Sequence, residues 1–337
     1  MSEKRLFHIG PDGKLRRISA LGELLSSLKD GGYAWLDFFD PSREDLTPLV
    51  EGLGLHPLSV EDCLDENQIP KIEDFPTNTF ILFNGCRHQD GVLALEEVDL
   101  ILGRNFLVTV SGHQGGSVKF HERVEEIAAL DPAGIQRGPD FLLHVVLDHV
   151  VDHKFAAIEA LQDSIDTAEE EILQGPSAFS PEILMRLRRE LLTLRKSLFH
   201  EREILVKICR RDCPYVSEAA IYHFRDIYDH LAKYFEIVEI SREMITTLME
   251  MYLSMINNRM AEVANRTNAT VRRLTLITTV FMPLTLLAGI GGMSEWSMMT
   301  GPSNWKIAYS IFLLGLVVIG AVNYWLLKRV ESRQPSR

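Results

Sequence analysis

Two long apolar stretches lie near the C-terminal end of the chain. Between Arg273 and Glu295 there are 21 residues without a charge, and between Lys306 and Lys328 there are 21 more. A helix rises about 1.5 Å per residue and the core of a bilayer is about 30 Å thick, so each stretch can span a membrane once. The alternative, a buried helical hairpin in a soluble protein, explains less well why both stretches are of full length and have basic residues beside them.

Basic residues lie at the outer ends of both spans. Arg272 and Arg273 precede the first span and Lys328 and Arg329 follow the second, whereas the connecting segment from Gly291 to Trp305 has no lysine or arginine. The positive-inside rule then places both termini in the cytoplasm. We therefore expect a multi-pass protein of the cell inner (cytoplasmic) membrane.

The first 115 residues alternate between short strands and helices. Strands are predicted at Tyr33–Asp37, Thr79–Asn84, Glu96–Leu102 and Asn105–Ser111, with a hairpin between the last two. A helix is predicted over Ser42–Leu53, with Ser42 as its N-cap. This pattern indicates a small α/β domain.

From Gly115 onward the pattern is helical. Helices are predicted at 117–130, 141–173 and 180–210, followed by one from near Val216 to Ala288, in which Pro283 is the only proline and glycine is absent. A helix of about 70 residues would be roughly 110 Å long at 1.5 Å per residue. It needs packing partners along its length. Because it carries the first span, it would couple the soluble part to the membrane mechanically.

The chain therefore divides into seven expected segments. They are a cytoplasmic α/β domain (1–115), a cytoplasmic helical region (116–213), a stalk helix (214–273), the first transmembrane helix (274–291), an extracytoplasmic loop (292–305), the second transmembrane helix (306–328) and a basic cytoplasmic tail (329–337).

One face of the long helix repeats at alternating spacings of three and four residues, which is the a/d pattern of a coiled coil. The repeat comprises Asn268, Val271, Thr275, Thr278, Met282, Thr285 and Gly289. Small and hydroxylated residues here suit close helix packing in lipid and equally suit a ring of copies around a water-filled pore. We take these positions, with Leu274, as the candidate pore lining and Met282 as its apolar constriction. A single two-span chain cannot enclose water, so transport requires an oligomer.

Charge and motifs exclude several classes of function. The formal net charge is −12, which disfavours nucleic-acid binding by phosphate neutralisation. The four cysteines are scattered, and the chain has no P-loop, dinucleotide fingerprint or nucleophile elbow. We therefore expect neither an enzyme nor a cofactor.

Four groups of residues occur in an order shared by one family of membrane proteins. They are His56–Leu58 with Glu61–Asp62 and Gln68–Glu73; Phe224–His230; Tyr252–Ser254 with Asn257 and Arg259; and Phe281–Thr285 followed by Ala288–Ile290 and Gly292–Met293. Together they resemble the CorA superfamily of divalent metal cation (Mg2+/Co2+) transporters, and the resemblance covers almost the whole chain.

The resemblance implies an α+β fold with membrane helices. It implies an N-terminal α/β cytoplasmic domain, a long stalk helix continuous with the first transmembrane helix, and a second transmembrane helix, assembled as a funnel-shaped homopentamer in lipid. It further implies conduction of hydrated Mg2+, often with Co2+ or Ni2+. The divalent cation would be both substrate and regulator.

The expected pore mouth departs from the family pattern. Gly291–Gly292–Met293–Ser294 occupies the position of the family signature Tyr-Gly-Met-Asn. A ring of Ser294 side chains, one from each copy, can still accept hydrogen bonds from water bound to the cation. Glu295, the next residue, would concentrate cations at the pore mouth. Magnesium is the first expectation, and the zinc-transporting branch of the superfamily is the alternative.

The resemblance also implies closure of the pore by intracellular Mg2+. The matching acidic residues are Glu61 and Asp62 in the α/β domain and Asp226 in the stalk of a neighbouring subunit. A divalent ion offsets the repulsion between such carboxylates. Without the resemblance, these would be ordinary solvated charges.

Two interpretations stay open outside the resemblance. His149 and His153 lie one helical turn apart beside Asp148 and Asp152, as in a transition-metal site, although a pair without a third ligand is more typical of a solvated face. The two spans could also tether a membrane-anchored sensor or interaction protein.

Overall fold

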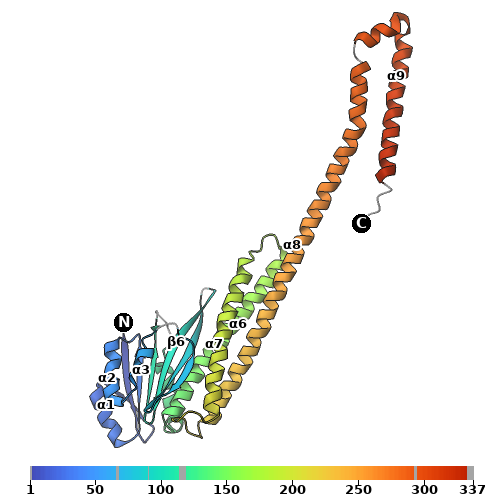
Figure 1. Cartoon of the computed structure of the whole chain (residues 1–337). Helices are drawn as coiled ribbons and strands as arrows, with labels where there is room; N and C mark the ends of the chain where they lie inside the picture. Colours follow the sequence, from blue (N-terminus) through green and yellow to red (C-terminus); the bar gives the residue numbers. More distant parts are fainter. Residues whose placement is uncertain (1, 66–67, 90, 114–118, 292–293, 332–337) are drawn as a thin grey trace. The chain divides into compact units, whose positions relative to one another are not determined.

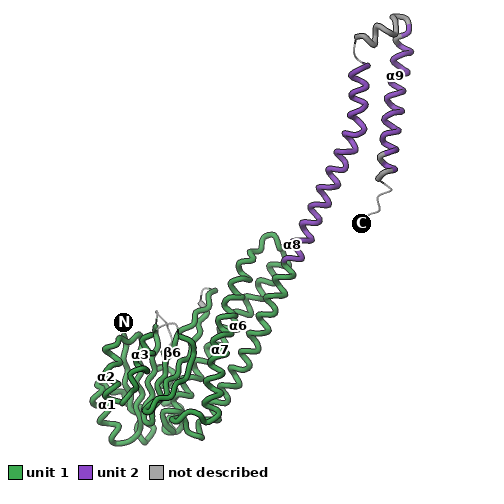
Figure 2. Tube along the Cα trace, in the orientation of Figure 1, with its two compact units in different colours: residues 1–252 green, residues 253–337 purple. Residues whose placement is uncertain are grey.

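The computed structural model describes residues 2–65, 68–89, 91–113, 119–291 and 294–331, without the side chains of residues 89, 294–303, 305, 327, 330 and 331. The chain forms two compact units, residues 1–252 and residues 253–337 (Figure 2). Helix α8 (Ile221–Gly291) contributes to both units.

A mixed sheet forms the centre of the α/β part of the first unit. Its order is β2-β1-β3-β7-β6-β5-β4, and β3 and β7 run parallel while the other neighbouring strands run antiparallel. The strands are β1 (Glu3–Ile9), β2 (Leu15–Ile18), β3 (Tyr33–Phe39), β4 (Lys71–Asp74), β5 (Asn78–Gln89), β6 (Val92–Gly103) and β7 (Phe106–Ser111). The four predicted strands are β3, β5, β6 and β7, and the predicted hairpin between β6 and β7 is confirmed.

Helices cover both faces of this sheet (Figure 1). Helices α1 (Leu21–Ser27), α2 (Arg43–Leu53) and α3 (Pro57–Asp62) pack on one face, and α6 (Pro139–Gln174) packs against the other. Strand β7, with the sequence FLVTVS, is therefore buried at every residue, Thr109 and Ser111 included.

The predicted N-terminus of α2 is confirmed by its contacts. The Ser42 backbone N–H and hydroxyl both donate to the Asp45 carboxylate, at 2.9 and 2.8 Å. Gly54 ends the helix with a φ of 72°, a left-handed conformation that glycine adopts without strain.

The helical part of the first unit follows the predicted order with shifted ends. It contains α4 (His121–Leu130), α5 (Pro132–Ile135), α6, α7 (Glu182–Cys209) and the first part of α8. Helix α8 begins at Ile221 rather than near Val216, because the Asp140 carboxylate accepts the Ser217 N–H at 2.9 Å and holds that segment as a turn.

A buried ion pair joins the helices to the edge of the sheet. Strand β4 pairs with Thr79–Leu82, so Asn84 of β5 lies beyond its end. There the Asn84 N–H donates to Glu201 of α7 at 3.0 Å, and its carbonyl accepts from Lys154 of α6. The Lys154 and Glu201 side chains are 0% exposed, with Nζ and Oε1 3.0 Å apart.

The second unit consists of the end of α8 and helix α9 (Ser294–Glu331). Within the described residues, α8 and the Lys306–Leu326 part of α9 are long and apolar enough to cross a membrane, in agreement with the two predicted spans. The segment 294–305, which we expected as a loop, is helical.

Candidate functional site

In the second unit, one face of α8 packs against α9. Leu276, Val280, Leu284 and Leu287 are partly covered, at helical spacings of four, four and three. Leu284 lies against Gly320 of α9, and Phe312 of α9 lies against Gly291. The small Gly320 permits the two helices to approach closely.

The candidate pore lining lies on the opposite face of α8. At about 100° per residue, Thr278 and Met282 lie about half a turn away from Val280, and Thr285 lies about 140° from it. All eight candidate lining residues are exposed, and Met282 is 74% exposed. The exposed set is Asn268, Val271, Leu274, Thr275, Thr278, Met282, Thr285 and Gly289. Within the second unit, this face is left free by α9.

The threonine hydroxyls on this face donate their protons to their own helix. Thr275 donates to the Val271 carbonyl at 2.9 Å, Thr278 to that of Leu274, and Thr285 to that of Phe281 at 2.8 Å. Each hydroxyl oxygen keeps lone pairs that point away from this bond. The exposed face therefore offers hydrogen-bond acceptors, which a cation's coordinated water molecules can use as donors.

A further acceptor lies beside them. Pro283 has no N–H, so the Thr279 carbonyl lacks its usual helical donor. The Thr279 hydroxyl, like its neighbours, donates to a carbonyl four residues earlier, that of Thr275.

Most of the exposed residues of α9 between Ile307 and Leu326 are apolar. Ile307, Ile311, Leu314 and Val318 are each at least half exposed, which suits a surface against lipid hydrocarbon. The expected pore-mouth residues cannot be placed in the same way: Gly292 and Met293 lie outside the described residues, as do the side chains of Ser294 and Glu295.

The three expected regulatory residues lie at two places in the first unit. Asp62 ends α3 and accepts from Lys71 at 2.9 Å, and Glu61 beside it is exposed. Asp226 is exposed on α8. Among the described residues, no contact joins Asp226 to Glu61 or Asp62 within one chain, so a shared cation would need a second copy.

The structure also gathers an acidic group that the sequence did not single out. Asp148 and Asp152 of α6 and His230 of α8 place one potential ligand atom each within 4.8 Å of the others. Burial raises the pKa of Asp148, and the Asp152 carboxylate raises it further. The spacing of four residues between Asp148 and Asp152 on α6 was the available sequence signal. Their proximity depends on how α6 packs beside α8.

The fold and the candidate site together define a two-span membrane protein. Its long helix, α8, carries a row of hydrogen-bond acceptors on the side that faces away from α9. The model of the CorA-like Mg2+ transporter protein family matches residues 30–329. The chain belongs to this family, whose members are ion channels or transporters rather than enzymes.

Individual relatives agree with this assignment. The cobalt/magnesium transport protein CorA of Thermotoga maritima is 32% identical over 310 residues, covering 88% of this chain and 82% of that protein. The zinc transport protein ZntB of Klebsiella pneumoniae is 29% identical over 188 residues, covering 54% of this chain and 53% of that protein. The complete structure of the CorA magnesium transporter from Methanocaldococcus jannaschii matches with a TM-score of 0.70 at 22% identity, covering 97% of both chains, which shows the shared fold.

Proposed function

We propose that this protein conducts hydrated divalent cations, foremost Mg2+, through a pore formed by several copies of α8, five if it assembles as the family resemblance implies. The pore would cross the cytoplasmic membrane with both termini in the cytoplasm. Co2+ and Ni2+ would be further substrates.

The main support for this proposal is the position of the acceptor row, which is formed by the hydroxyl groups of Thr275, Thr278 and Thr285. It lies on the side of α8 that α9 does not cover, so copies of α8 can face one another while α9 faces lipid. Five of the seven positions in the repeat are polar or small, whereas a lipid-facing surface would be apolar throughout.

The chemistry of the row suits an ion that keeps its water. Mg2+ loses coordinated water reluctantly, and that water is a strong donor. Hydroxyl oxygens whose own protons are already donated can accept from it, so the ion need not be dehydrated. Inward movement of a double charge gains about 4.6 kcal/mol per 100 mV, at roughly 2.3 kcal/mol per elementary charge. Met282 would interrupt the acceptors with an apolar ring and so serve as the gate.

Intracellular Mg2+ would close this pore at subunit interfaces. Glu61 or Asp62 of one copy and Asp226 of the next would share the ion. The separation of these residues within one chain supports a site between two copies. Removal of the cation from such a site would leave carboxylates that repel one another, and this would loosen the assembly.

Zinc is the second candidate substrate. The chain departs from the family signature at Gly291 and Ser294, and a relative that matches about half of this chain is a zinc transport protein. Serine in place of asparagine would give a wider and weaker ring of acceptors.

Two measurements in proteoliposomes test the proposal. The first compares uptake of Mg2+, Zn2+, Co2+ and Ni2+, with and without a pH gradient, and ranks the ions. The second compares Thr278→Val with Thr279→Val. Both residues bond to a carbonyl four residues earlier, but Thr279 lies outside the row. We expect Thr278→Val to lower Mg2+ uptake more than Thr279→Val. Equal effects would contradict a pore lined by this face, and absence of uptake for all four ions would contradict transport itself.

A further inference from the structure

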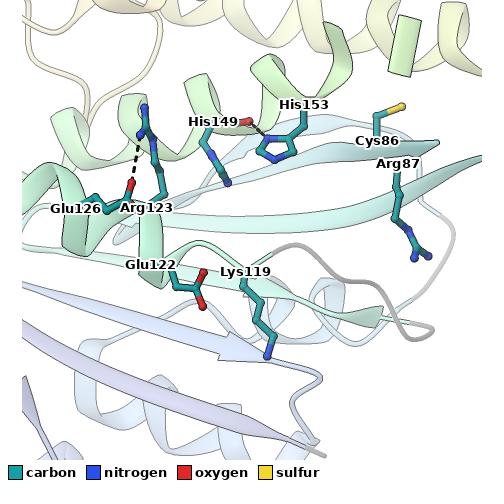
Figure 3. A pocket seen from close by; sticks show the side chains of 8 residues that line it. All are labelled: Cys86, Arg87, Lys119, Glu122, Arg123, Glu126, His149 and His153. Carbon is teal, nitrogen blue, oxygen red and sulfur yellow. Dashed lines mark hydrogen bonds and ion pairs between the residues drawn. The ribbon is translucent and has the colours of Figure 1, made fainter. Parts of the chain in front are cut away.

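A cavity of about 440 Å³ lies in the first unit, and none of the regulatory residues proposed above lines it (Figure 3). Its walls come from β5, α4 and α6, together with Lys119. His149 and His153, one turn apart on α6, both line it. The proposed transport function uses neither histidine.

The two imidazoles lie close together and project toward the cavity in Figure 3. Their ring centroids are 4.3 Å apart at an interplanar angle of 71°. A transition-metal ion binds an imidazole nitrogen at about 2.0–2.1 Å, so one ion can bridge two rings at this separation.

Hydrogen bonding selects the nitrogen of His153 that is available. His153 Nδ1 lies 2.8 Å from the His149 carbonyl oxygen, which can only accept, so Nδ1 carries the proton. The lone pair is then on Nε2. A backbone carbonyl that holds Nδ1–H in this way is a common orienting partner for metal-binding histidines.

Two of the three basic residues that line the cavity pair with carboxylates outside its lining. Arg87 pairs with Glu96 at 2.9 Å, and Lys119 pairs with Glu3 at 3.2 Å. This disfavours an anion as the ligand. The Glu126 carboxylate is 64% exposed and acts electrostatically on His149. As a metal ligand it would exchange its 3.4 Å contact with Arg123 for the cation.

We propose that His149, His153 and Glu126 bind one transition-metal cation of the Zn2+, Co2+ or Ni2+ class, with water completing its coordination. Imidazole nitrogen favours these ions over Mg2+, which prefers oxygen ligands. The site lies in a part of the protein expected to face the cytoplasm, so it would sense transition metals there. Its existence does not depend on the transport proposal, because it is defined by binding alone.

Binding of Co2+ to the full-length, metal-free protein in detergent tests the site. Bound Co2+ is followed by its visible absorption and by calorimetry, with excess Mg2+ present to occupy oxygen-ligand sites. We expect His149→Gln/His153→Gln to weaken Co2+ binding at one site by more than the roughly 10–100-fold that loss of a merely orienting residue costs. Glu126→Gln should weaken it less, and Glu125→Gln on the same helix should leave it unchanged.

His230→Gln separates this site from the group formed by Asp148, Asp152 and His230. If the double histidine variant binds Co2+ as the parent does, or if His230→Gln alone removes the absorption, the proposal is wrong. Circular dichroism of each metal-free variant checks folding, and the single variant His153→Gln replaces the double one if the latter does not fold.

Discussion

Replacement of Lys154 by methionine tests how the soluble helices are held to the sheet. The substitution keeps the length of the side chain but removes its charge. It leaves Glu201 buried without a counter-charge and deprives the Asn84 carbonyl of its donor at the sheet edge. Glu201 keeps the Asn84 N–H and the Ser197 hydroxyl as partners, so the local geometry is retained.

The expected loss of stability is large because both side chains of the Lys154–Glu201 pair are completely buried. Breaking a buried ion pair from one side costs about 3–5 kcal/mol, whereas an exposed pair contributes about 0–1 kcal/mol. In a protein of about 150–250 residues, 1 kcal/mol shifts the melting temperature by roughly 2–4 °C, so Lys154→Met should lower it by about 6–20 °C.

The melting temperature is measured by thermal unfolding of the full chain in detergent, and unfolding of the first unit is followed by pulse proteolysis. Lys196→Met, an exposed lysine of α7, is the matched control and should change the melting temperature little. A shift for Lys154→Met no larger than that of the control would refute the view that this pair fastens α6 and α7 to β5.

Three further predictions concern gating and pH. Met282→Ala should raise ion leak in proteoliposomes, because it removes the apolar ring; unchanged flux would count against Met282 as the gate. Asp226→Lys should weaken the protection that Mg2+ gives the soluble part against protease, whereas Glu243→Lys, also exposed on α8, should not; equal protection in both would remove Asp226 from the site. Burial, followed by the Asp99 carboxylate, raises the pKa of Glu97 from 4.5 to about 7. As pH rises between these values, the unfolded chain loses this proton while the folded chain keeps it, so stability falls with pH. Glu97→Gln should flatten that fall in melts recorded across this window, and an unaltered pH profile would be inconsistent with this assignment.

The pattern of the sequence was sufficient for elements whose signals are local. The Ser42–Asp45 cap, helices α6 and α7, the length of α8 and the two apolar spans each depend on residues near one another in the chain. Strands β1, β2 and β4 and helices α1 and α3 were not predicted. Of these, β2, β4 and α3 are short, and a strand such as β4, with the polar sequence KIED, is stabilised by its pairing with β5 rather than by its own composition.

For the candidate sites, the sequence determined which residues repeat on one face of α8 and that His149 and His153 share a turn of α6. Only the tertiary structure decided that α9 covers the opposite face of α8, and that Glu126 of α4 shares a cavity with the two histidines. It also brought His230 to Asp148 and Asp152. The physical reason is the same in each case: helical periodicity fixes where a side chain points on its own element, whereas its neighbour across the interface is chosen by the packing of segments distant in the chain.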